Sequence, residues 1–151
     1  MQKRFLTFDQ VSHHIQEIQN HLHQQNWRPD LVVGVSRGGL VPAVMLSHAY
    51  DVKMICLDIS LRDKKLVESR GFDQTHDLAS KGSRVLVVDD INDSGNTIAT
   101  VRTVLQDLDP DLVKIAVLVN NNDSHQRVDA CGLTISKQVD PRWIVYPWEA
   151  A

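Results

Sequence analysis

The sequence has little cysteine, and its two cysteines stand apart from each other. Cys56 and Cys131 belong to no CxxC pair and have no neighbouring histidines to complete a metal-binding pattern. Disulfide frameworks and zinc sites depend on such closely spaced groups. We therefore expect two buried, inert thiols in a reducing compartment, in preference to a metal site or a disulfide.

The chain also lacks a basic excess and any long apolar run. Its formal net charge is −3, without the positive surface that nucleic-acid binders usually present. No apolar stretch approaches the roughly 18 residues of a membrane span. The first ten residues, MQKRFLTFDQ, contain no apolar signal core. These absences predict a cytoplasmic protein that neither binds nucleic acid nor inserts into a membrane, and they require any anionic ligand to be held locally.

Short apolar runs alternate with amphipathic segments along the chain, whose 151 residues suffice for one core but not for two. The runs indicate buried strands at 31–35, 54–59, 85–88 and 114–119 and in the tail at 141–149, and helices are expected at 9–22, 40–50 and 97–108. The charged segment 60–77 has weak periodicity and suits a mobile loop. This order predicts one α/β domain over residues 1–151, with a mainly parallel twisted sheet flanked by helices.

The first helix is expected to be capped by Asp9 and to bury an apolar stripe. Its histidines at positions 13, 14, 21 and 23 are then expected on a solvated face, in preference to a metal site.

Three acids and a polar turn follow the run 85–88, in the sequence VLVVDDINDSGNT. The turn at 93–97 offers backbone N–H groups, two hydroxyls and the positive end of a helix dipole, which suits a phosphate monoester. Asp89 and Asp90 would accept hydrogen bonds from a vicinal diol. A diol and a phosphate on one small molecule indicate a ribose 5-phosphate. Response-regulator receivers share the acid pair, but theirs lies near the start of the domain, and here it lies past the middle of the chain.

The loop SRGG ends the run 31–35. Its glycines let backbone N–H groups approach a ligand, and Arg37 supplies a forked positive charge. By itself the loop is also compatible with a surface turn and a solvated arginine. In a parallel sheet, however, ligands bind at the carboxyl ends of the strands, where SRGG, the acid-rich segment and NNND at 120–123 all fall.

VLVVDDINDSGNT resembles the phosphoribosyl-diphosphate signature of the type I phosphoribosyltransferases. VVGVSRGGLVPA and WIVYPWE further resemble segments of the bacterial xanthine-guanine (6-oxopurine) enzymes. The resemblance covers nearly the whole chain. It implies a single-domain type I phosphoribosyltransferase fold with a flexible hood, here residues 60–77. It also implies transfer of the 5-phosphoribosyl group to a free purine base (guanine, xanthine or hypoxanthine) with release of pyrophosphate, with Mg²⁺ as cofactor and a homodimer or homotetramer as the assembly.

The same resemblance implies a role for each motif. Asp89 and Asp90 hold the ribose hydroxyls, and Asp89 contacts the metal through water. Asp93 is the candidate general base for the purine N7 proton, and Arg37 acts with the metal to stabilise the leaving pyrophosphate. The residues implied to bind phosphoribosyl diphosphate are Ser36, Arg37, Gly38, Gly39, Asp89, Asp90, Asp93, Ser94, Gly95, Asn96 and Thr97. Further cations for pyrophosphate are available in the hood at Arg62, Lys64, Lys65 and Arg70.

For the base, the resemblance implies stacking on Trp143, with Ile144 beside it. The 6-oxopurine enzymes carry a lysine just past the fourth strand, where this chain has Asn120. An ammonium only donates hydrogen bonds, whereas an amide donates and accepts. We therefore expect Asn120 to contact the base and to select oxo bases less strongly, unless Lys137 or a hood residue replaces the missing charge.

Two alternatives stay open. One is a phosphoribosyltransferase for another base, such as adenine. The other is a non-catalytic nucleotide or phosphoribosyl-diphosphate sensor of the same fold. Such sensors usually lose parts of the catalytic loops, and this chain keeps both Arg37 and Asp93, so the enzyme is favoured.

Overall fold

The computed structural model describes residues 1–62 and 65–149, with side chains except those of residues 60–70. One sheet has the strand order β4-β3-β2-β5-β6-β7. Five strands run parallel, namely β2 (Leu31–Ser36), β3 (Lys53–Arg62), β5 (Val85–Asn92), β6 (Val113–Asn121) and β7 (Ala130–Ile135), and β4 (Lys65–Arg70) pairs antiparallel with β3 at one edge. The predicted mainly parallel sheet is confirmed.

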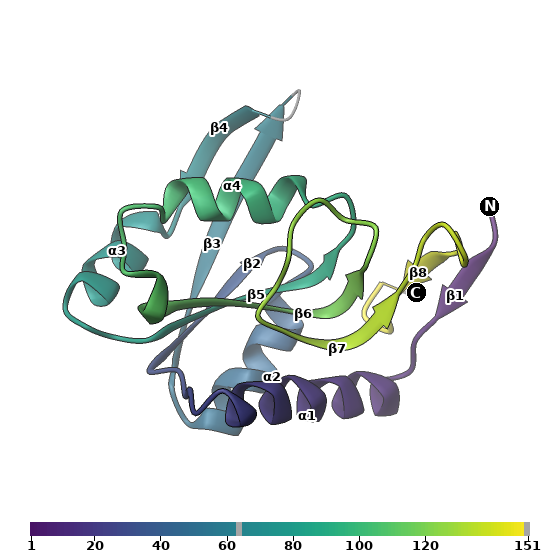
Figure 1. Ribbon diagram of the computed structural model, residues 1–151, viewed down its shortest axis with the longest axis horizontal. Helices are drawn as coiled ribbons and strands as arrows, with labels where there is room; N and C mark the ends of the chain where they lie inside the picture. The colour runs from purple at the N-terminus through teal and green to yellow at the C-terminus, as the bar shows by residue number, and fades with distance from the viewer. Residues whose placement is uncertain (63–64, 150–151) are drawn as a thin grey trace.

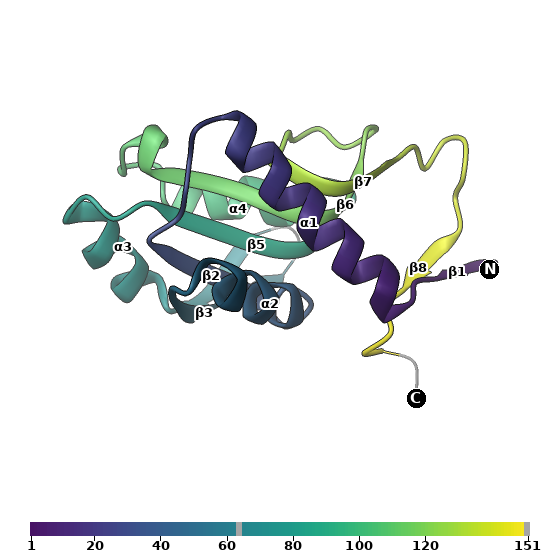
Figure 2. The same cartoon turned by 90° about the horizontal axis from the view of Figure 1, so that it is seen from below.

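Helices cover both faces of this sheet (Figures 1 and 2). α1 (Phe8–Gln24) and α2 (Leu40–Tyr50) pack on one face, and α3 (Phe72–Ser80) and α4 (Asn96–Val104) on the other. A short 3-10 helix, Pro110–Leu112, leads into β6. Successive residues of β2, β5 and β6 enter the two cores alternately, which explains why these strands read as continuous apolar runs. Among the described residues, no helix is long and apolar enough to cross a membrane.

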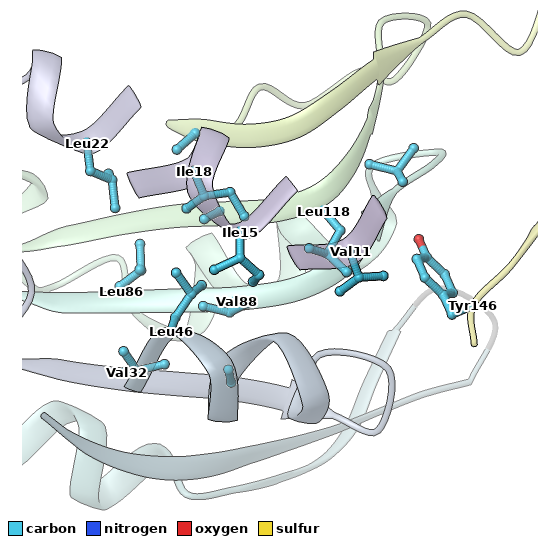
Figure 3. Packing of buried hydrophobic residues seen from close by; sticks show 14 of the residues in the cluster. Val11, Ile15, Ile18, Leu22, Val32, Leu46, Leu86, Val88, Leu118 and Tyr146 are labelled. Carbon is cyan, nitrogen blue, oxygen red and sulfur yellow. The ribbon is translucent and has the colours of Figure 1, made fainter. Parts of the chain in front are cut away.

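α1 shows how the local sequence sets an element. Its predicted apolar stripe is buried against the sheet, as Figure 3 shows for Val11, Ile15, Ile18 and Leu22. The cap differs from the prediction: the Thr7 hydroxyl, not Asp9, accepts a hydrogen bond from the Gln10 backbone N–H, and the Gln10 side-chain oxygen accepts one from the Thr7 backbone N–H. This reciprocal capping box satisfies two free N–H groups, which one Asp cap could not do.

Three strands, β1 (Lys3–Phe5), β4 and β7, escaped the sequence-based prediction. β7 contains Gly132, whose added Cβ would lie within 3 Å of the His14 backbone, so a small residue there lets α1 pack closely. β1 has only three residues and pairs in parallel with the predicted tail strand, β8 (Trp143–Val145). The two chain ends therefore form a small second sheet beside the main one (Figure 1).

The described residues of segment 60–77 contain a strand and a helix that we did not predict from the sequence, and the expected mobility stays a prediction. β3 continues into it, β4 pairs back along β3, and α3 begins at Phe72 after Gly71 takes a left-handed conformation, with φ of 84°. Backbone pairing supplies the order that the weak side-chain periodicity did not indicate. The cation candidate Lys64 lies outside the described residues, and Arg62, Lys65 and Arg70 lie where side chains are not described, so their predicted contact with pyrophosphate stays a prediction.

Two predictions about titratable side chains were wrong. His14 is buried, at 8% exposed, because its position on α1 faces β7, and its Nδ1 has no hydrogen-bond partner among the described residues. His21 is also half-buried, and its Nδ1 accepts a hydrogen bond from the Cys131 backbone. Cys56 is exposed and Cys131 half-buried, so the thiols are not the pair of core residues that we expected.

His14 should make the stability of the fold dependent on pH. Burial, followed by the charge of His13, lowers the pKa of His14 below its usual 6.5. The unfolded chain therefore binds a proton at a higher pH than the folded chain, so the free energy of unfolding should decrease as the pH falls below about 6.5. Urea unfolding at pH 7.5, 6.5 and 5.5 measures this slope. His14→Leu should flatten it, and the matched variant of an exposed histidine on the same helix, His23→Leu, should not; equal slopes would contradict the assignment.

Candidate active site

The predicted site residues gather at the carboxyl ends of β2, β5 and β6. After β2 the chain continues to α2 on one face of the sheet, and after the neighbouring β5 it continues to α4 on the other. The chain thus leaves these two neighbouring strands toward opposite faces, and open α/β sheets bind ligands at such a point.

Asp89 and Asp90 lie in the second half of β5. Asp89 is only 8% exposed. Its Oδ1 accepts the Asp90 backbone N–H at 2.9 Å, and Asp90 Oδ1 accepts the Ile91 N–H at 2.9 Å. Burial, followed by the charge of Asp90, raises the pKa of Asp89 well above its usual value, and burial also raises the pKa of Asp90. Two carboxyls that burial shields from solvent in this way are suited to accept hydrogen bonds from hydroxyl groups or to bind a cation.

The SRGG loop lies directly against the acid pair. A Cβ on Gly38 would come within 2.8 Å of both carboxylate oxygens of Asp90, and a Cβ on Gly39 would overlap the carbonyl of Val88. Only glycine permits this approach of two backbones. Arg37 is exposed, and the Ser36–Arg37 peptide bond is cis.

The turn 93–97 forms the start of α4. Gly95 caps the helix with φ of 102°, and Asn96 is the first helical residue. The first turn of a helix leaves N–H groups without intrahelical acceptors, so they can bind an anion. Residues 89–98 line a hollow of about 170 Å³ at this point. The predicted phosphate turn therefore adjoins the predicted diol acids.

The end of β6 and the loop after it hold this turn in place. NNND was expected near the site, but this supporting role was not predicted from the sequence. Asn121 Nδ2 donates to the Asp93 carbonyl at 3.0 Å, and the His125 backbone N–H donates to the Ser94 carbonyl at 3.3 Å. An added Cβ on Gly95 would lie 2.7 Å from the hydroxyl oxygen of Ser124. The run of amides and small polar residues at 120–124, directly after a buried strand, was the available signal.

A second hollow opens beside the first. Its lining residues come from β5, the loop after β7 and the tail: Asp90, Ile91, Asp93, Lys137, Trp143, Ile144, Tyr146 and Glu149. Ile144 is buried, whereas Trp143 is 51% exposed and offers ring surface for stacking. Asp90, Ile91 and Asp93 line both hollows. The exposed Asp93 therefore stands where the two meet.

Comparisons with known proteins agree with this geometry. The family model described as Phosphoribosyl transferase domain matches residues 2–151. The chain belongs to this family. Xanthine-guanine phosphoribosyltransferase of Cereibacter sphaeroides is 30% identical, over 83% of this chain and 71% of the relative. Xanthine phosphoribosyltransferase 1 of Saccharomyces cerevisiae is 22% identical, over 99% and 90%. The crystal structure of purine phosphoribosyltransferase from Pyrococcus horikoshii matches with a TM-score of 0.75 and 30% identity, covering 100% of this chain and 96% of that one.

Within this phosphoribosyltransferase, Asn120 lies differently from what the sequence suggested. Its Oδ1 accepts a hydrogen bond from Asn92 Nδ2 at 2.9 Å, across the pairing of β5 and β6. Asn92 is buried and also donates to the Gln126 carbonyl at 2.9 Å. Asn120 is thus part of a polar network between strands, and among the described residues it does not line the hollow that holds Trp143.

The tail of the phosphoribosyltransferase reaches the acid pair. The Tyr146 hydroxyl donates to the Asp90 carbonyl at 3.0 Å, and the ring stacks on Trp148 with centroids 4.9 Å apart. The Glu149 carboxylate accepts the Tyr146 N–H at 3.0 Å. Burial raises the pKa of Tyr146, so its hydroxyl keeps its proton and acts as a donor. Tyr146 is buried, and its contact with Asp90 was not foreseen from the sequence.

The acid pair also meets the requirements of Mg²⁺. This ion prefers oxygen ligands and is usually held by one or two carboxylates together with substrate phosphates and water. Asp89 and Asp90 supply two buried carboxyls, and no cluster of three or more potential metal ligands occurs in the described ranges. The residues fit a cation shared with a phosphorylated substrate.

Proposed function

We propose that this phosphoribosyltransferase transfers the 5-phosphoribosyl group from phosphoribosyl diphosphate to a free purine base, preferring a 6-oxopurine. The observation that carries the proposal is the meeting of two different hollows at Asp93. One is polar and adjoins a helix start, and the other has an aromatic edge. A ribose 5-phosphate in the first would direct its C1 toward a base in the second.

Each part of the first hollow has a chemical role in this reaction. The turn 93–97 binds the 5-phosphate through backbone N–H groups, and Asp89 and Asp90 accept hydrogen bonds from the ribose hydroxyls. The SRGG loop holds the pyrophosphate, and the Arg37 guanidinium stabilises the charge that this group gains as it leaves. Mg²⁺, when bound by the substrate oxygens and Asp89, would supply further positive charge for the leaving group.

Bond formation takes place at the junction. The N9 lone pair of the base forms a bond to C1, and the C1–O bond breaks with its electrons passing to pyrophosphate. The Asp93 carboxylate accepts the proton from N7, so that the product nucleotide is neutral at its imidazole ring.

The choice of a purine rests on the second hollow and on the relatives. Trp143 provides a stacking surface, and its adjoining acids and Lys137 provide hydrogen-bonding groups for a base edge. The named relatives are xanthine-guanine, xanthine and purine phosphoribosyltransferases, which supports a purine acceptor here.

Turnover of radiolabelled phosphoribosyl diphosphate with guanine, hypoxanthine, xanthine and adenine, in the presence of Mg²⁺, tests this proposal. Formation of a labelled nucleoside monophosphate with at least one oxo base is expected. Product from adenine alone would favour the adenine alternative. Tight binding of phosphoribosyl diphosphate without turnover of any base would favour the sensor.

Arg37→Ala should weaken the binding of phosphoribosyl diphosphate by roughly 10- to 100-fold, because a charge-assisted hydrogen bond to the pyrophosphate is lost. A nucleoside monophosphate lacks that group, so its affinity should change little. Calorimetric titration of both ligands measures the difference. The matched control is Arg84→Ala, which removes an arginine just before the amino end of β5, at the opposite end of the strand from the acid pair. Equal weakening of both ligands by Arg37→Ala would refute the role of the loop.

A further inference from the structure

Lys137 lines the hollow that carries Trp143, although it lies 17 positions beyond the place where the 6-oxopurine enzymes have their lysine. It comes from the turn between β7 and β8, which only the folded chain brings beside Asp93. Of the described residues that line this hollow, Lys137 is the one cation, and Asp90, Asp93 and Glu149 are its acids.

The ammonium of Lys137 is held on one side and free on others. Nζ donates to the Arg142 carbonyl at 3.0 Å. An ammonium carries three donors, so this bond leaves two for a ligand. Nζ lies 5.9 Å from the centroid of the Trp143 ring, which is near the outer limit of a cation–π contact. Trp143 therefore attracts the charge weakly and leaves it available to an acceptor on a bound base.

The carbonyl that holds Lys137 is itself fixed. The Arg142 guanidinium makes two hydrogen bonds to Asp140, at 2.8 and 2.7 Å. Arg4, on β1, approaches the same carboxylate at 3.9 Å. The hydrogen bonds from Arg142 lower the pKa of Asp140 to about 2, so the pair stays charged across the pH range of an assay.

The backbone of Lys137 is tied to the candidate general base. Its N–H donates to Asn121 Oδ1 at 3.1 Å, and Asn121 Nδ2 donates to the Asp93 carbonyl at 3.0 Å. Asn121 is buried, so one amide fixes the distance between the two loops. A base that gives its N7 proton to Asp93 would have its six-membered ring within the same hollow as the ammonium.

We infer that Lys137 is the specificity-determining residue of the base site, donating a hydrogen bond to the oxygen at position 6 of the base. The inference rests on the proposed purine transfer. An ammonium cannot accept a hydrogen bond, so it favours an oxo group over the exocyclic amine of adenine. Lys137 thereby takes the place of the lysine that this chain lacks at position 120, and selectivity for oxo bases is retained.

Measurements of kcat/KM for hypoxanthine and adenine on the wild type and Lys137→Met test the inference. Methionine keeps the length and apolar stem but removes the charge. For hypoxanthine we expect kcat/KM to fall by roughly 10²-fold, the value of one hydrogen bond to a charged group. For adenine kcat/KM should stay the same or rise, and KM for phosphoribosyl diphosphate should not change. The matched control is Lys81→Met, at an exposed position after α3.

Two further variants complete the test. Lys137→Arg keeps a charged donor and should retain the preference for hypoxanthine. Lys137→Gln should lose the preference, and its polar side chain suits this turn if Lys137→Met fails to fold. An unchanged preference in both Lys137→Met and Lys137→Gln would overturn the inference and leave the proposed function standing. A wild type that turns over no purine would overturn both.

Discussion

Asp93→Asn is expected to lower kcat by roughly 10²-fold or more while leaving the affinity for phosphoribosyl diphosphate largely unchanged. The amide has nearly the shape of the carboxylate but cannot accept the purine N7 proton. The turn itself should persist, because Asn121 binds the Asp93 carbonyl and not its side chain. Steady-state kinetics with the preferred base, together with calorimetric titration of phosphoribosyl diphosphate, separates the two effects.

Asp51→Asn provides the matched control, since Asp51 is an exposed aspartate at the end of α2, away from both hollows. Its kinetics should equal those of the wild type. A parallel loss of kcat and of phosphoribosyl-diphosphate affinity in Asp93→Asn would indicate that Asp93 shapes the phosphate turn and is not the base.

The fold was predictable wherever burial controls the sequence. Four strands of the main sheet and three helices were placed because strands covered on both faces read as apolar runs and helices covered on one face read as stripes. The tail strand β8 was predicted as well. β1 and β7 lack these signals, since β1 has three residues and the packing of Gly132 against α1 cannot be read from β7 alone. The β3–β4 pairing depends on backbone hydrogen bonds, which leave little trace in side-chain periodicity.

The predicted site residues on β2, β5 and α4 meet because the carboxyl ends of neighbouring parallel strands lie together, which the motifs themselves imply. Asn120 and Asn121 show the limit of this reasoning. Adjacent residues on a strand point to opposite faces, so a difference of one position decides which amide reaches the Asp93 loop. The position of Lys137 depends further on where β7 ends and β8 begins, and no local sequence pattern predicts that.

The second large effect is expected at the buried acid pair, where Asp89→Asn should stabilise the ligand-free protein and weaken the binding of phosphoribosyl diphosphate. Burial and the charge of Asp90 raise the pKa of Asp89, so the folded chain holds its proton more tightly than the unfolded chain does. The stability gained in this way is present below the ordinary pKa of 3.8 and is lost as the pH rises through the raised value.

Once the pH exceeds this raised pKa, the wild type carries a buried charge that destabilises the fold and that asparagine removes. Tm of Asp89→Asn should exceed that of the wild type at pH 7.5, and the difference should shrink as the pH is lowered toward 4.5. The same variant loses an acceptor for the ribose hydroxyls and the metal, so its affinity for phosphoribosyl diphosphate with Mg²⁺ should fall by roughly 10²-fold. Asp30→Asn should behave in the opposite way. The hydrogen bond from the Arg84 backbone N–H lowers the pKa of Asp30, so removing the Asp30 charge should reduce Tm at pH 7.5. A lower Tm for Asp89→Asn at pH 7.5 would mean that Asp89 stabilises the strand end, and the trade between stability and binding at this acid pair would then not exist.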